Sequence, residues 1–86
     1  MKVAVWDTYV TKANNILMHF DIIVPERTGE ELVLNYGRSY LQNKGYGALP
    51  LTIAECQFCH IEQVKPNWQA AIEQNGYYIY EMENCS

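Results

Sequence analysis

The chain has 86 residues, 49% of them hydrophobic and 19% charged, so residues 1–86 can bury the core of one domain and lack the composition of a disordered protein. Six Lys and Arg residues against ten Asp and Glu residues give a formal net charge of −4. Nucleic-acid backbones and anionic membrane surfaces are bound through clustered cations, so we expect neither nucleic acid nor membrane as a partner.

The first residues of the chain do not have the pattern of an export signal. Lys2 is followed by a strand-like segment without a small-residue cleavage site. No stretch approaches the roughly 20 consecutive apolar residues that span a bilayer. Three cysteines without an export signal indicate free thiols or a metal site in a reducing compartment. We therefore expect a cytoplasmic protein.

Two strands joined by a turn are predicted at the start of the chain. Residues 2–10 and 16–24 are rich in Val, Ile, Tyr, Trp and Phe, which favour strands. Between them, Asn14 and Asn15 supply turn chemistry, because Asn tolerates positive φ angles. Pro25 closes the second strand, since it lacks the N–H group that sheet pairing needs.

The register of this hairpin decides which side chains share a face. We favour pairing Asp7 with His19, because a slip of one residue buries Asp7 among apolar neighbours and costs desolvation energy. One face is then nearly apolar and consists of Ala4, Trp6, Val10, Ile16, Met18, Phe20 and Ile22. The opposite face carries Asp7, Tyr9, His19 and Asp21.

The first helix is predicted to start at Thr28, because Thr28 and Glu31 have the spacing of a capping box. Apolar residues at helical spacing follow, namely Leu32, Val33, Tyr36, Gly37, Tyr40 and Leu41. Gly45 suits the left-handed residue that ends a helix, so the helix should stop near Lys44.

The second half of the chain predicts two strands and a helix. Thr52 and Glu55 form another capping-box pattern and indicate a short turn before a strand at residues 58–64. Pro66 suits the first position of a helix that ends before Gly76, and residues 77–80 form the last strand. The order is β-β-α-β-α-β, which predicts a two-layer α+β fold: a four-stranded sheet with two helices on one face.

The chain resembles the family catalogued as domain of unknown function 2024, which consists of small, mostly bacterial proteins. The resemblance rests on MKVAVWDTYV at residues 1–10, MHFDIIVPE at residues 18–26, ECQFCHIE at residues 55–62 and GYYIYEMENC at residues 76–85. It implies a compact α+β domain. It assigns no activity or ligand, and it carries no functional residue over to this chain.

The densest group of reactive side chains is Cys56-Gln57-Phe58-Cys59-His60. Thiolate and imidazole groups are the ligands of zinc, so our leading hypothesis is a zinc site made of Cys56, Cys59 and His60, completed by Cys85 or His19. In a helix, the three residues of the motif share one face. In a strand, Cys59 and His60 should point to opposite sides, which counts against joint ligation.

Three other interpretations of this motif remain open. The pattern Cys-x-x-Cys-His also attaches c-type haem, although attachment normally follows export. A thiol redox pair needs its first cysteine exposed at the N-terminus of a helix, and the local sequence does not place Cys56 there. In the third interpretation both thiols simply pack in a core, because free Cys is among the most buried residue types.

Asp7, His19 and Asp21 form a second candidate site on one face of the hairpin. A carboxylate beside an imidazole is suited to a general base or to binding a metal ion. An ordinary solvated Asp–His pair is the simpler interpretation. An enzyme would require these side chains to converge in a pocket, and no nucleophile is placed beside them, so we lean away from catalysis.

We therefore expect a binding or accessory domain with a Cys/His metal or thiol site. The alternative is a structural or protein-interaction module in which the cysteines only pack. Seven tyrosines and two tryptophans, with Tyr77, Tyr78 and Tyr80 in the last strand, suggest a protein partner or a homodimer for an uncovered sheet face.

Overall fold

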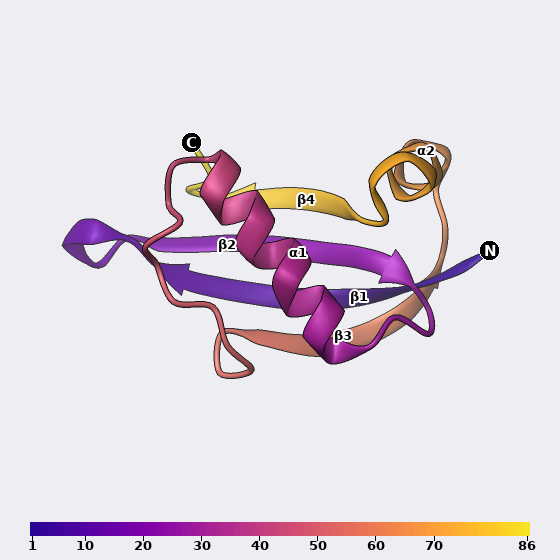
Figure 1. Cartoon of the computed structure of the whole chain (residues 1–86), viewed down its shortest axis with the longest axis horizontal. Helices are drawn as coiled ribbons and strands as arrows, with labels where there is room; N and C mark the ends of the chain where they lie inside the picture. Colours follow the sequence, from indigo (N-terminus) through magenta and orange to yellow (C-terminus); the bar gives the residue numbers. More distant parts are fainter.

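Four antiparallel strands form one sheet in the computed structural model, which describes residues 1–86 (Figure 1). The strands are β1 (Lys2–Thr11), β2 (Leu17–Pro25), β3 (Cys56–Gln63) and β4 (Tyr78–Glu83), arranged in the order β3-β1-β2-β4. The helices are α1 (Glu30–Asn43) and α2 (Pro66–Asn75), and a 3-10 turn, η1 (Ala13–Asn15), joins β1 to β2. The predicted order β-β-α-β-α-β and the two-layer α+β fold class are confirmed.

The hairpin turn confirms the role predicted for its two asparagines. Asn14 and Asn15 have φ angles of 65° and 61°, which few other residue types adopt readily. The N–H of Lys12 donates to the carbonyl oxygen of Ile16 at 2.7 Å and closes the turn. This bond sets the pairing of the whole hairpin, starting with Thr11 opposite Leu17.

Our hairpin register was wrong by two residues. Asp7 lies opposite Asp21, and His19 lies opposite Tyr9. The reason is the position of the turn, because the Lys12–Ile16 bond centres it on Asn14 rather than on residue 13. Side chains alternate with a period of two, so the two-residue shift leaves every side chain on its predicted face. Ile16 is the exception, since it precedes β2 and is exposed.

Helix α1 starts later than the sequence predicted. Its N-cap is Gly29, and no side chain caps the first turn, so the predicted capping role of Thr28 is wrong. The N–H of Thr28 instead donates to the carbonyl oxygen of Pro25 at 3.0 Å, in the turn that ends β2. The predicted end is confirmed, because Gly45 has a φ of 86° and the N–H of Tyr46 donates to Leu41 at 2.7 Å.

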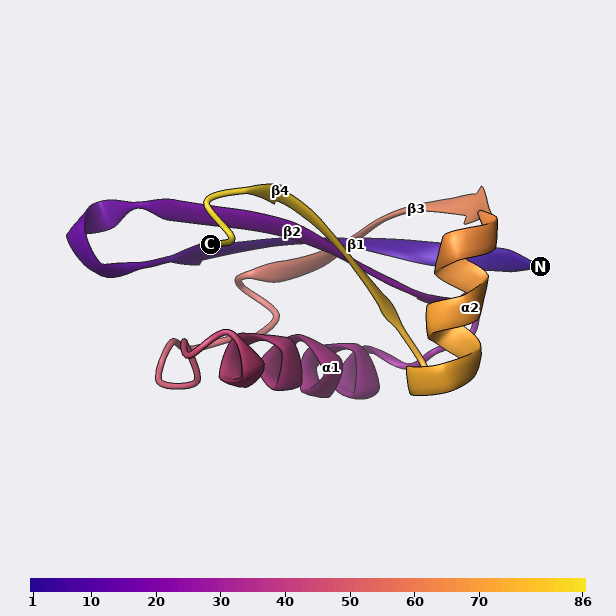
Figure 2. The same cartoon turned by 90° about the horizontal axis from the view of Figure 1, so that it is seen from above.

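The main core lies between α1 and one face of the sheet (Figure 2). The sheet contributes Ala4, Val10, Met18, Phe20, Ile22, Val24 and Cys56, and the rest comes from Val33, Leu34, Tyr40, Leu41, Leu51 and Cys85. Burying one large apolar side chain stabilises a fold by about 1.5–3 kcal/mol, so this layer holds the domain together. Neither helix is long and apolar enough to cross a membrane.

Helix α2 stands at one end of the sheet, where Figure 2 shows it running from the level of the sheet to the level of α1. It begins at Pro66 and ends at Asn75, before Gly76, whose φ is 94°, as the sequence predicted. Trp68 and Ile72 pack against Val3, Val5 and Ile23, which alternate along the strands with the residues under α1. The expectation that both helices cover the same face was therefore wrong for α2. Most of that second face remains uncovered by helix.

The turn before β3 confirms the second capping-box pattern. The carboxylate of Glu55 accepts hydrogen bonds from the N–H and the hydroxyl of Thr52, at 2.7 and 2.8 Å. Strand β3 then begins at Cys56, two residues before the predicted start at residue 58. The whole Cys56–His60 motif therefore lies in a strand, and its side chains are distributed over both faces of the sheet.

Gly37 allows α1 to lie close to the sheet. A Cβ atom at this position would collide with the side chain of Leu51 and come within 2.9 Å of Ile22. We predict that Gly37→Ala lowers the free energy of unfolding by about 1–3 kcal/mol, because the overpacked helix must move away from the core. Chemical denaturation measures this loss.

Ser39→Ala is the matched control, because Ser39 is exposed on the same helix. It should change the free energy of unfolding by less than about 0.5 kcal/mol. Equal stability of the Gly37→Ala variant and the unmodified protein would contradict the close packing of α1.

Candidate functional site

The structure does not bring the four proposed zinc ligands together. Cys56 pairs with Thr8 and is buried beneath α1, whereas Cys59 is exposed and projects from the other face. Cys85 lies beyond β4 at the opposite edge of the sheet, where its thiol donates to the carbonyl oxygen of His19 at 3.3 Å. Cys56 and Cys59 on opposite faces also cannot act as a dithiol pair. All three cysteines are free.

Two of the three thiols match the alternative in which cysteines pack as small apolar side chains. Cys56 is 1% exposed and Cys85 is 8% exposed, and both belong to the core under α1. Burial raises the pKa of the Cys56 thiol above its ordinary value. Cys85 is also held more firmly than its place near the C-terminus suggested. Only Cys59 remains available for chemistry at the surface.

A β-bulge brings Cys59 and His60 to the same side of β3, which corrects our expectation that a strand would separate them. The pairing with β1 shifts between Val5 and Trp6, so His60 lies opposite Val5, Phe58 lies opposite Trp6, and Cys59 has no partner. The Sγ atom of Cys59 is 3.1 Å from Nδ1 of His60. On the other side of the ring, Nε2 of His60 is 2.8 Å from the carboxylate of Glu62.

Asp7, His19 and Asp21 converge on the uncovered face of the sheet. The Nε2 atom of His19 is 3.9 Å from Oδ1 of Asp7 and 3.7 Å from Oδ1 of Asp21. One ligand atom from each of the three side chains lies within 4.8 Å of the other two. The ring of Tyr9 stacks on the His19 imidazole, with 4.1 Å between ring centroids, and so restrains its orientation.

Within this trio, Asp21 has a raised pKa. Its pKa is raised from 3.8 to about 7, chiefly by burial. A hydrogen bond with Asp7 and the negative charge of Asp7 raise this pKa further. His60 lowers this pKa and Glu62 raises it, both to a smaller extent. Asp21 therefore keeps its proton until close to neutral pH.

Two buried atoms of the trio have no hydrogen-bond partner. They are Nε2 of His19 and Oδ1 of Asp21, which face each other at 3.7 Å. A buried polar atom without a partner costs about 1–3 kcal/mol, so such atoms are uncommon in folded proteins without a functional reason. Both atoms are therefore available to a ligand between them.

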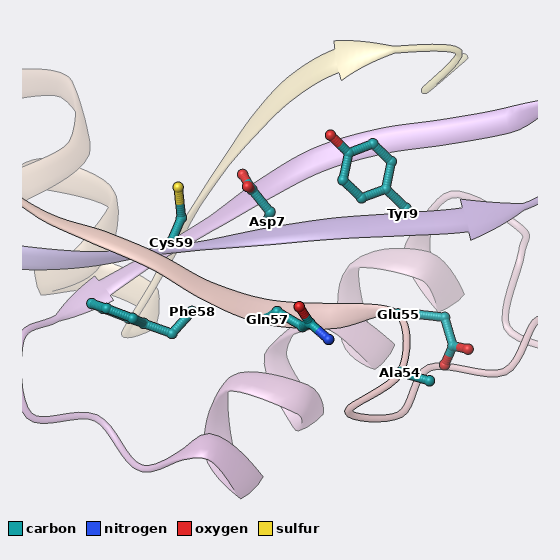
Figure 3. Close-up of a pocket in the computed structure, with 7 residues that line it drawn as sticks. All are labelled: Asp7, Tyr9, Ala54, Glu55, Gln57, Phe58 and Cys59. Atoms are coloured by element: carbon teal, nitrogen blue, oxygen red, sulfur yellow. The ribbon is translucent and has the colours of Figure 1, made fainter.

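A hollow of about 420 Å³ adjoins this cluster. Figure 3 shows its lining side chains, and the Sγ of Cys59 and the carboxylate of Asp7 project to the same side of the sheet. The lining residues are Asp7, Tyr9, Ala54, Glu55, Gln57, Phe58 and Cys59. Solutes in the hollow can thus reach Asp7, the one member of the cluster that lines it, from the β3 edge.

Comparison with known proteins places the chain in a family. The family model described as "Domain of unknown function (DUF2024)" matches residues 1–82. The chain belongs to this family. The NMR structure of protein NE1680 from Nitrosomonas europaea, a structural-genomics target, is 36% identical to it, with a TM-score of 0.85 and full coverage of both chains. No curated protein matches the sequence.

The sequence analysis did not predict the contact of Glu62 with His60 or the bulge beside it. His60 and Glu62 are two residues apart, and this spacing places two side chains on the same face of a strand. That signal was present in this DUF2024 sequence. The bulge itself had no local signal, because it depends on how β3 pairs with β1.

The raised pKa of Asp21 predicts a pH-dependent loss of stability. The unfolded chain releases this proton near pH 3.8, whereas the folded protein keeps it to about pH 7. Because the folded state binds more protons in this window, stability should fall by up to about 1.4 kcal/mol per pH unit as the pH rises through it, and remain low above it.

We predict that Asp21→Asn removes this loss, because its amide stays neutral. Melting temperatures of both proteins, measured from pH 4 to 8.5 with a chelator present, should match at low pH and diverge toward neutral pH, with the variant more stable. Curves that stay parallel across the range would contradict the raised pKa.

Proposed function

We propose that this DUF2024 member is a binding domain that holds one divalent transition-metal ion, such as Zn²⁺, through Asp7, His19 and Asp21. The observation that carries the proposal is the convergence of three ligand atoms, two of which are buried without a hydrogen-bond partner. This site replaces the Cys/His site expected from the sequence.

The distances within the trio support a metal ligand set. Zinc binds nitrogen and oxygen ligands at about 2.0–2.2 Å, which puts neighbouring ligand atoms of a tetrahedral site about 3.4 Å apart. The separations of 3.7 and 3.9 Å need only a small contraction. A cation entering here displaces the proton of Asp21 and offsets the repulsion between the charges of the two carboxylates.

We favour binding over catalysis for two reasons. Of the three side chains, only Asp7 lines the neighbouring hollow, so a substrate there would not reach His19 and Asp21 directly. No nucleophile is placed among the three ligand atoms. We also place the protein in the cytoplasm, where three free thiols persist.

We predict that Zn²⁺ raises the melting temperature of the protein. A ligand at a hundredfold excess over its Kd stabilises the folded state by about 2.7 kcal/mol, which raises the melting temperature by about 11–22 °C for a domain of this size. His19→Gln and Asp21→Asn should each abolish most of the shift, because each removes a ligand. Thermal denaturation and calorimetric titration measure the effect.

His60→Gln is the matched control for His19→Gln. Both histidines lie on the uncovered face, but His60 is outside the trio and half-exposed. Its variant should keep most of the Zn²⁺-dependent shift. A shift lost equally in both histidine variants, or no binding by the unmodified protein, would reject the site.

A second candidate function is self-association through the uncovered face. Tyr9, Leu17 and Tyr80 are 44–47% exposed there, and exposed apolar side chains on one sheet face are typical of interfaces. We predict a concentration-dependent dimer in sedimentation, weakened by Tyr80→Ser. A monomer at all concentrations would remove this candidate.

A further inference from the structure

The bulge in β3 places the thiol of Cys59 on the same side of the sheet as the trio. At most positions of β3, one residue faces one residue of β1, but Cys59 is the extra residue at the register shift. Figure 3 shows its Sγ atom and the Asp7 carboxylate projecting from neighbouring strands to the same side, while Phe58 points the other way. Without the bulge, Cys59 and His60 would lie on opposite faces.

The Cys59 thiol has neighbours on two sides. Its Sγ atom projects to the same side of the sheet as the carboxylate of Asp7, which belongs to the trio. Its Sγ is also 3.1 Å from Nδ1 of His60. Glu62, at 2.8 Å from Nε2, favours the tautomer with the proton on Nε2, so Nδ1 presents its lone pair to the thiol.

We propose that Cys59 is the fourth ligand of the metal ion, so that the site selects zinc-like ions over Mg²⁺ and Ca²⁺. This inference rests on the proposed function and adds the class of ion. Two carboxylates and one imidazole leave a tetrahedral ion one ligand short. The thiol lies outside this three-residue cluster but on the same side of the sheet as Asp7, so ligation moves Sγ toward the ion that Asp7 also binds.

Ligation requires the thiol to lose its proton, and the Cys59 side chain is exposed to solvent. As the bond between Sγ and the ion forms, the S–H bond breaks and its proton passes to the solvent. No electron transfer is involved. A thiolate ligand favours zinc, cobalt and similar ions, whereas Mg²⁺ and Ca²⁺ prefer oxygen ligands alone.

The test is a titration with Co²⁺ alone, followed by absorption spectroscopy, on protein kept reduced without a chelator. Co²⁺ in a tetrahedral site gives visible d–d bands, and a thiolate ligand adds a charge-transfer band in the near ultraviolet. We expect both, saturating at one Co²⁺ per chain. In Cys59→Ser the charge-transfer band should disappear while the d–d bands remain, and the affinity should fall roughly tenfold or more, since even outer-shell contacts cost about tenfold.

The outcomes separate this inference from the proposed function. Co²⁺ binding without a charge-transfer band in the unmodified protein leaves the trio as the site and overturns the role of Cys59. A band that survives in Cys59→Ser comes from Cys56 or Cys85 and overturns it too. Displacement of Co²⁺ by equimolar Mg²⁺ would overturn the selectivity. Absence of any Co²⁺ binding overturns both proposals. If the variant fails to fold, the second measurement is protection of the exposed Cys59 thiol from a thiol reagent by bound Co²⁺, because Cys56 and Cys85 are buried; an unprotected Cys59 overturns its role.

Discussion

The antiparallel pairing of β1 with β2 places two aspartates directly opposite each other in the centre of the sheet. Like charges opposite one another in a sheet are destabilising, and here burial adds a desolvation cost that raises the pKa of Asp21 to about 7. The chain cannot shift the hairpin by one residue to escape this contact, because the other face of the same strands forms the core under α1. The register that packs the core therefore also concentrates charge on the uncovered face, where a proton or a cation can neutralise it.

Within the Cys56–His60 motif, the residues before and after the bulge in β3 have different surroundings. Cys56 lies before the bulge, faces α1 and packs in the core, while Cys59 projects beside Asp7 on the other face. The Cys-x-x-Cys-His pattern is thus not one site, since its two thiols lie on opposite faces of the sheet. His60 and Glu62 extend the polar face along β3, so that titratable groups from three strands lie next to one another.

The arrangement of the helices keeps this polar face accessible. Helix α1 covers the opposite face, and α2 covers only the end that contains Val3, Val5 and Ile23. Protein NE1680 from Nitrosomonas europaea, with a TM-score of 0.85, has the same fold. A fold alone does not define a function, so the proposed metal site rests on the distances, burial and unpartnered atoms of Asp7, His19 and Asp21.

The sequence by itself determined the elements and the faces of the strands. Pro66, Gly45 and Gly76 mark helix ends through backbone conformations that only such residues adopt readily. The alternation of side chains assigned Asp7, His19 and Asp21 to one face even though our register was wrong, because a shift of two residues preserves the faces. Only the tertiary structure decided which residues meet across strands. That choice depends on the turn at Asn14 and on the bulged pairing of β3 with β1, which joins residues 48 to 61 positions apart in the chain. Local periodicity carries no information about such pairing.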